Sequence, residues 1–274
     1  MYDEPYRWVE AVGNRRQYLD DQFRQGSPLV AVSYVDGIVL LTTSHGTPKL
    51  YEIYDRIALG GMGHPADLEK LRFAILDMAH TEGFQRSPGD VTGARLIKYG
   101  LAPAIKQAFE EIYKAPYITK LLLAELGNLP NQDRFFTIDY DGTFEEHDDM
   151  AVLGAASHIE DTMRAYLKTH VTPSAATLQA VLEVAVRTWA LGALSQSHDN
   201  EQSESSSSDS KETESNKKDS FSEEQILEHL QTGLKEKTLE CVVLDRQAPG
   251  SSKYRTINQQ EILSLLPLLN KTTN

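Results

Sequence analysis

The sequence is poor in cysteine and has no long apolar run. Its one cysteine, Cys241, cannot form a disulfide within the chain, so we expect a reducing compartment such as the cytoplasm. The most apolar helical stretch, residues 175–194, contains Glu183 and Arg187 and is expected to be a core helix and not a membrane span. Residues 1–4 (MYDE) offer neither the basic nor the apolar start of a secretory signal, which also favours the cytoplasm.

Basic residues are also scarce. The chain has 27 Lys and Arg residues against 40 Asp and Glu residues, which gives a formal net charge of -13. Binding to nucleic acid needs a clustered basic surface, and the sequence shows none, so we expect no nucleic-acid partner. The hydrophobic fraction of 40% with a mean hydropathy of -0.41 is instead typical of a water-soluble globular protein.

Acidic residues gather in one serine-rich segment. Residues 198–224 contain nine acidic residues and three lysines and almost nothing apolar, so we expect residues 195–221 to be a disordered linker. The stretch that follows, residues 222–274, is too short for a stable core of its own. We therefore expect its strand to return to the main sheet and to complete the same domain as residues 1–194.

A helix followed by a hairpin opens the chain. Trp8, Val12, Leu19 and Phe23 fall near helical spacing and predict an amphipathic helix. Residues 27–43 form two β-branched runs joined at Asp36-Gly37, which is a strong hairpin signal. This order places a helix immediately before the first strand.

The rest of the chain alternates between runs of strands and pairs of helices, which predicts helices packed on both sides of antiparallel sheets. Strands are predicted at 49–54, 57–61, 118–126, 135–140, 150–153, 239–245 and 254–257, and an Asp141-Gly142 turn closes the fourth of them. Helices are predicted through 68–79, 91–109, 158–168, 175–194, 222–234 and 259–269.

Four short motifs carry a family resemblance. They are KLYEIYDRIALGGMG at 49–63, DVTGARL at 90–96, IDYDG at 138–142 and LECVVLDR at 239–246. In this order and spacing, the chain resembles the α subunits of bacterial 20S proteasomes of the actinobacterial type. The resemblance implies an α+β fold, a four-layer α/β/β/α sandwich of the N-terminal nucleophile hydrolase type.

The resemblance also implies a function. It predicts a non-catalytic subunit that forms the outer, gated rings of the core as homo-oligomeric heptamers, while separate β subunits carry out threonine-protease catalysis. The implied partners are β subunits, an AAA ATPase activator, and unfolded or tagged protein substrates. A third kind of protein, a stand-alone scaffold with neither β partner nor ATPase, stays open.

One alternative keeps catalysis in this chain. In the resemblance, Ser27 occupies the place of the β subunits' N-terminal threonine, and Gly26 precedes it like a processing site. The alternative is therefore a hydrolase autoprocessed at Gly26-Ser27 with Ser27 as nucleophile. Pro28 and the helix before the strand disfavour it, and so does Thr43, which stands where the catalytic subunits have an aspartate.

The resemblance assigns roles to Lys49 and to the first six residues. Lys49 is expected to line a pocket between neighbouring subunits and to contact the C-terminal carboxylate of an activating ATPase. From its position alone, it would be a solvated lysine at a strand edge. Met1, Tyr2, Asp3, Glu4, Pro5 and Tyr6 are expected to form a gate, although Glu4 replaces an arginine of the related gating motif. A frayed terminus is the other interpretation.

Metal and cofactor sites are not expected. Residues 60–63 (GGMG) lie between a strand and a helix but lack the Lys-Ser/Thr pair of a phosphate-binding loop, so they predict a tight turn. His147, Asp148 and Asp149 are expected to lie in an acidic loop. The eight histidines include no helical H-x-x-x-H pair.

Overall fold

The structure is a computed structural model that describes residues 4–111, 113–173, 175–205 and 221–266. The helices are α1 (Glu4–Phe23), α2 (Pro65–Gln85), α3 (Gly93–Leu96), α4 (Ala102–Glu110), α5 (Ser157–His170), α6 (Leu178–Ser205), α7 (Glu223–Glu236) and α8 (Gln259–Leu265). The strands are β1 (Leu29–Tyr34), β2 (Gly37–Ser44), β3 (Leu50–Tyr54), β4 (Ile57–Gly63), β5 (Thr119–Glu125), β6 (Arg134–Ile138), β7 (Phe144–His147), β8 (Met150–Leu153), β9 (Thr238–Asp245) and β10 (Tyr254–Ile257). Short 3-10 turns lie at Pro88–Asp90 and Pro130–Gln132, and a π-helical turn at Ile97–Leu101 joins α3 to α4.

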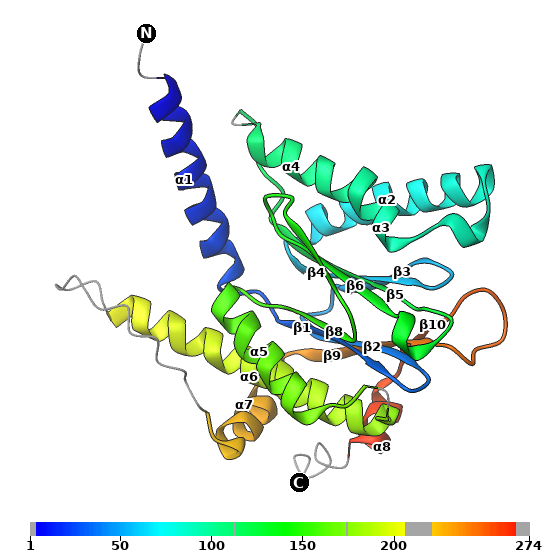
Figure 1. The fold of residues 1–274 in the computed structure, drawn as a ribbon. Helices are drawn as coiled ribbons and strands as arrows, with labels where there is room; N and C mark the ends of the chain where they lie inside the picture. Colours follow the sequence, from blue (N-terminus) through cyan, green and yellow to red (C-terminus); the bar gives the residue numbers. More distant parts are fainter. Residues whose placement is uncertain (1–3, 112, 174, 206–220, 267–274) are drawn as a thin grey trace.

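Two antiparallel five-stranded sheets lie face to face between two layers of helices (Figure 1). One sheet has the order β10-β9-β2-β1-β8, and α5 to α8 cover its outer face. The other has the order β3-β4-β5-β6-β7, and α2 to α4 cover its outer face. The expected four-layer α/β/β/α sandwich is thereby confirmed.

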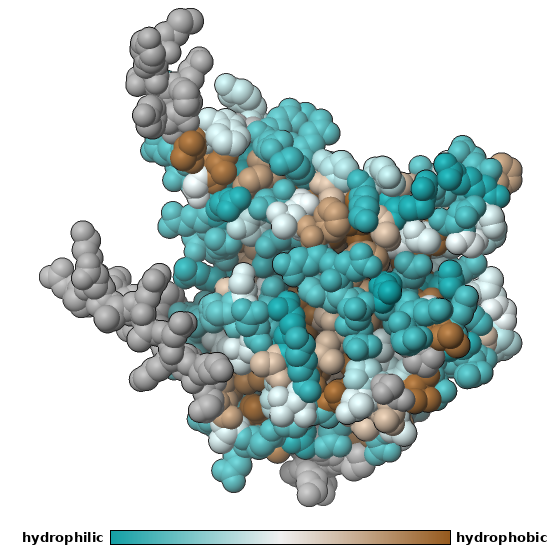
Figure 2. Space-filling view, in the orientation of Figure 1, coloured by the Kyte–Doolittle hydropathy of each residue, from teal (hydrophilic) through white to brown (hydrophobic). Residues whose placement is uncertain are grey.

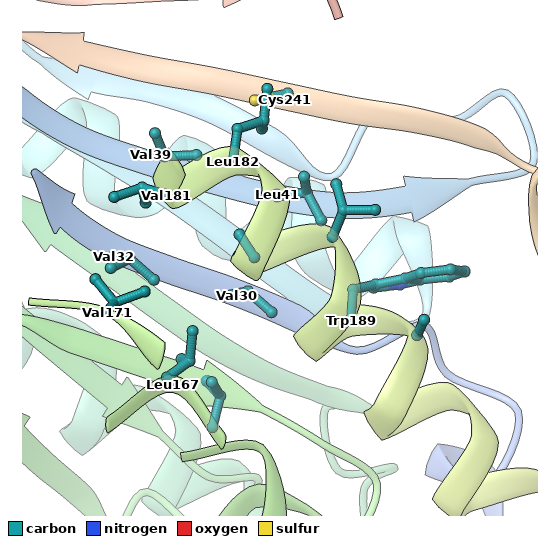
Figure 3. Packing of buried hydrophobic residues seen from close by; sticks show 14 of the residues in the cluster. Val30, Val32, Val39, Leu41, Leu167, Val171, Val181, Leu182, Trp189 and Cys241 are labelled. Atoms are coloured by element: carbon teal, nitrogen blue, oxygen red, sulfur yellow. The ribbon is translucent and has the colours of Figure 1, made fainter. Parts of the chain in front are cut away.

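The core follows the period-two alternation of the strands. In β1, Val30 and Val32 face the helices, while Leu29 and Ala31 face the second sheet. Every residue of β1 and β2 is buried, because both faces of this sheet are covered. Figure 3 shows α6 against β1 and β2, with Trp189 among the buried side chains.

The hairpin between β1 and β2 lies where the sequence predicts it, but its glycine serves another purpose. Tyr34 pairs with Gly37, so Gly37 already belongs to β2. A Cβ on Gly37 would lie only 1.9 Å from the carbonyl oxygen of Leu244 in β9. Glycine is required at this position because β9 passes so close to it.

The turn predicted at residues 60–63 was wrong for residues 60–62, which belong to β4. Gly63 ends β4 with φ +131, and α2 begins two residues later at Pro65. The predicted Asp141-Gly142 turn is confirmed. Gly142 has φ +83 in the turn after β6, where the amide of Asp139 donates to the carbonyl of Thr143 over 2.8 Å. His147 lies at the end of β7, a strand that the sequence analysis did not predict.

The end of the chain completes the first sheet, as expected. β9 lies between β2 and β10 and pairs with β2 along its whole length. The predicted linker was wrong for residues 195–205, because α6 continues to Ser205. Residues 206–220 of that linker lie outside the described residues. Helix α7 begins after Ser222, whose side chain accepts from the amide of Gln225 in a capping box.

Candidate functional site

The C-terminal half of α1 is packed into the body. Leu19 and Phe23 are fully buried with Met62, Phe109 and Tyr140. The rings of Phe23 and Tyr140 are stacked with their centroids 5.9 Å apart. Only the second part of the predicted apolar stripe therefore faces the protein, because Leu19 and Phe23 are buried whereas Trp8 is 49% exposed.

Polar contacts hold the second half of the same helix. Arg15 donates to the carbonyl oxygen of Phe109 at the end of α4 over 2.8 Å, which satisfies a carbonyl left free at a helix terminus. The hydroxyl of Tyr140 donates to Asp20 over 2.9 Å. Gln196 of α6 donates to the carbonyl oxygen of Gly26 over 2.9 Å. Three separate elements thus fix α1 and the turn after it.

Ser27, the candidate nucleophile of the alternative hypothesis, is only 4% exposed. Its Oγ lies 2.7 Å from Oγ1 of Thr43 and accepts a hydrogen bond from Nε1 of Trp189 over 3.0 Å. The preceding Gly26 is partly buried, and a Cβ there would lie 2.7 Å from the side chain of Met62. With α1 in place, Ser27 has no free α-amino group to act as a base.

Lys49 lies immediately before β3 and is partly buried. Its Nζ donates to the carbonyl oxygen of Thr43 over 3.1 Å, and its backbone amide donates to the carboxylate of Glu240 over 2.9 Å. Burial lowers the pKa of the Lys49 ammonium, Glu240 acts against that shift, and Lys237 adds to it. The structure brings Lys49 close to Thr43 but gives no bond between Lys49 and Ser27.

A buried lysine below the end of α1 was not predicted. Lys120 of β5 is 5% exposed, and its Nζ lies 3.7 Å from carboxylate oxygens of Asp139 and Glu160. It also lies 5.6 Å from the centroid of the Phe23 ring. Burial raises the pKa of both carboxyl groups, and Lys120 acts against that shift. The sequence signal for this buried lysine was its position within the apolar strand sequence TKLLLAE.

The expected gate falls only partly on described residues. Residues 1–3 lie outside them, and Glu4, Pro5 and Tyr6 form the first turn of α1. The helix thus begins before Trp8, the first residue of the predicted apolar stripe. Figure 1 shows the N-terminal half of α1 extending away from the sheets and their helical layers.

Within the described residues, no group of three or more His, Cys, Asp and Glu side chains is placed to hold a metal ion. His147 instead lies 3.0 Å from the hydroxyl of Thr137, and burial lowers its pKa. No helix of the described chain is long and apolar enough to cross a membrane.

Two stacked antiparallel sheets between helical layers, with the start of β1 at the candidate site, define an N-terminal nucleophile hydrolase-type sandwich. A family model described as "Proteasome subunit" matches residues 23–204. The chain therefore belongs to the proteasome subunit family. The matched range begins at the last residue of α1 and includes Ser27 and Lys49.

The relatives of this chain include actinobacterial proteins described as "Proteasome subunit alpha". One from Nocardioides sp. is 32% identical over 174 residues, which cover 61% of this chain and 65% of the relative. One from Actinosynnema mirum is 30% identical over 184 residues, which cover 66% of this chain and 68% of the relative. One from Streptomyces avermitilis is 27% identical over 267 residues, which cover 96% of this chain and 90% of the relative. The resemblance to the actinobacterial α type is thereby confirmed.

Proposed function

We propose that this chain is a non-catalytic α subunit of a bacterial 20S proteasome core in the cytoplasm. It forms the outer gated ring, and separate β subunits hydrolyse the unfolded or tagged proteins that pass through. The observation that carries the proposal is the covered start of β1. There α1 precedes Ser27, and Nε1 of Trp189 donates a hydrogen bond to the hydroxyl of Ser27. A β-type subunit needs this strand end free, so α1 favours the α role.

Ring formation is supported by apolar surface that the monomer leaves uncovered. Trp8, Val9 and Tyr18 of α1 are exposed, with Val9 at 65%. Figure 2 shows brown residues over the outer half of α1, beside the grey ones. Grouped exposed apolar side chains on a soluble protein mark interaction sites. In our proposal, neighbouring copies in a heptameric ring cover these side chains of α1.

Contact with β subunits is supported by a second exposed set of aromatic residues. Phe73 and Phe84 of α2 and Tyr99 of the adjoining π-helical turn are exposed, with Phe84 at 93%. They lie on the helical layer that covers the β3–β7 sheet (Figure 1). Large aromatic side chains are enriched at protein interfaces. We assign this layer to the β ring.

The gate is assigned to residues 1–6, as the family resemblance implies. In a ring, seven outer ends of α1 would surround the axis, and the residues at their tips would close the passage. Figure 1 supports this assignment, because the N-terminal end of α1 is farthest from the sheets.

ATPase docking is assigned to Lys49. An ammonium group has three donors, and the described contacts use one of them, on the carbonyl oxygen of Thr43. The others remain for a carboxylate at the C-terminus of an activator. Partial burial would strengthen such a charge-assisted contact relative to one in bulk water.

The test is co-expression with a β chain from the same cell, followed by electron microscopy and intact-mass measurement. We expect seven copies of this chain in each outer ring, a mass that includes α1, and peptide hydrolysis only when the β chain is present. A mature chain that begins at Ser27 and hydrolyses peptides alone would establish the autoprocessed alternative. Failure to co-assemble with any β chain would indicate a stand-alone scaffold.

A further inference from the structure

A pocket of about 380 Å³ lies between the end of α7, the start of β9 and α8. We call it the α7–α8 pocket. Leu234, Leu239 and Leu263 form its apolar walls, and Lys235, Lys237 and Gln231 contribute polar groups. Its volume lies in the range of ordinary ligand pockets. It is separate from the covered start of β1 and contains neither Ser27 nor Lys49.

The two lysines of this pocket have no counter-ion in the described part of the chain. Among the residues that the structure describes, neither Lys235 nor Lys237 lies within ion-pair distance of a carboxylate. The nearby carboxylate of Glu240 is bonded to the backbone amide of Lys49 instead. The lining of the pocket thus contains two lysines and no carboxylate, in a chain with a net charge of -13.

The charge of Lys237 lowers the pKa of two neighbouring basic groups. The pKa of Lys49 is lowered first by burial and also by Lys237. The pKa of His229 is lowered by the same two causes in the same order. An anion bound in the pocket would relieve this repulsion. Lysines at a helix C-terminus also stabilise the helix dipole, but that role needs no pocket.

The apolar walls restrict what the anion can be. Leu239 is buried and forms the floor of the pocket. Leu234 is partly buried, and Leu263 is exposed at the open rim. A free inorganic anion would not use these walls, and a nucleic acid would need more than two cations. An acidic peptide segment can place a carboxylate on the lysines and an apolar side chain between the leucines.

We propose that the α7–α8 pocket binds an acidic segment of a partner protein. Side-chain carboxylates of the segment contact Lys235 and Lys237, and an apolar side chain beside them packs against Leu234 and Leu263. This site does not depend on the assignment of Lys49 or on the gate. Its failure would leave the proposed proteasome role intact, and the converse also holds.

The test uses the full chain and a fluorescein-labelled, C-terminally amidated hexapeptide of alternating aspartate and leucine, read by fluorescence anisotropy. We expect saturable binding that Lys235→Glu with Lys237→Glu weakens at least about tenfold, because two attractions become repulsions. The matched control, Lys98→Glu with Lys168→Glu, changes the charge equally at exposed sites elsewhere and should bind like the wild type. Lys235→Ala with Lys237→Ala is the second variant, with circular dichroism as the folding check.

Further binding measurements test which chemical groups of the bound segment the pocket recognises. Affinity for the wild type should fall as ionic strength rises, since the contacts are partly exposed. An alternating aspartate-serine hexapeptide should bind at least about tenfold more weakly, because it buries no apolar side chain. Equal binding by the lysine variants and the control would overturn the proposal. So would equal binding of the serine peptide, a requirement for a free C-terminus, or equally tight binding of an oligothymidylate.

Discussion

Nε1 of Trp189 in α6 donates a hydrogen bond to Oγ of Ser27 across 3.0 Å, although 162 positions separate the two residues. The same Oγ lies 2.7 Å from Oγ1 of Thr43 in β2. One hydroxyl therefore joins the start of β1, the second strand and the helix behind them. In this chain the hydroxyl of Ser27 therefore has a structural role, because it links three elements of the fold.

Removing this indole bond should destabilise the protein. Trp189→Phe keeps an aromatic ring but leaves a buried hydroxyl short of a donor, so we expect a loss of about 1–3 kcal/mol in the free energy of unfolding. Urea denaturation of wild type, Trp189→Phe, Ser27→Ala and the double variant measures it. The coupling between the two changes should be about 1 kcal/mol. Strictly additive losses would show that the pair does not interact.

Gln196 should control how firmly the end of α1 is attached. Its Nε2 donates to the carbonyl oxygens of Arg24 and Gly26, over 2.5 and 2.9 Å. Gln196→Ala should speed amide hydrogen exchange of residues 19–26 by about tenfold, because the attachment of α1 is weakened. Gln231→Ala, an exposed glutamine in α7, is the control. Unchanged exchange in the Gln196 variant would mean that packing alone holds α1.

Glu125 should give a pH dependence of known sign. Its carboxylate accepts from the amide of Gly93 over 2.7 Å, and burial raises its pKa above the ordinary 4.5. A raised carboxyl pKa means that stability is fully present below 4.5 and is lost as the pH rises through the folded-state pKa. Glu125→Gln keeps the acceptor without the charge. Its stability relative to wild type should therefore increase from pH 4.5 to neutrality in urea titrations.

A control of opposite sign exists in α2. The hydrogen bond from Arg72 lowers the pKa of Glu69, so that carboxylate contributes stability above its ordinary pKa and loses it as the pH falls. Glu69→Gln should become less stable relative to wild type as the pH rises from acid. Parallel curves for the Glu125 and Glu69 variants would refute the sign given for Glu125.

Lys49→Ala tests the docking assignment. We expect ATPase-stimulated degradation of a folded substrate to fall at least about tenfold, because a charge-assisted contact is lost. Hydrolysis of small peptides by the assembled core should stay the same, because the chemistry belongs to the β chains. Lys168→Ala is the control at an exposed lysine of α5. Equal loss of both activities would argue against a docking role.

Deletion of residues 1–6 tests the gate. The shortened chain keeps Arg15, Asp20 and Phe23, which make the contacts between α1 and the body. We therefore expect intact rings in which basal hydrolysis of small peptides rises severalfold. Peptide turnover by the assembled core measures the effect, with a ring of Lys168→Ala subunits as the control. An unchanged basal rate would place the gate elsewhere in the chain.

The fold was largely predictable because its main signals are local. Alternating β-branched runs and helical spacing placed most strands and helices, and the short motifs gave the family. The extension of α6 was not predictable, because residues 195–205 are polar and look like linker. They remain helical where Gln196 and Asn200 find partners at Arg24 and Gly26, contacts between distant segments that override local composition.

The candidate site was predictable only in part. The sequence placed Ser27 and Lys49 but could not show that Trp189 binds the serine hydroxyl, since α6 reaches it only in the folded protein. Lys120 was missed for a similar reason. Its strand was predicted, but its burial depends on contacts with Phe23 of α1 and Glu160 of α5, which are distant from it in the sequence.

The position of β9 has a consequence for synthesis of the protein. β2 lies between β1 and β9, so one edge of β2 stays unpaired until residues 238–245 have left the ribosome. Every residue of β2 is buried in the folded protein, and such a strand, while unpaired, is a template for wrong pairing with other chains. Nascent chains should therefore depend on chaperones until β9 has been synthesised, and truncation before β9 should yield aggregates.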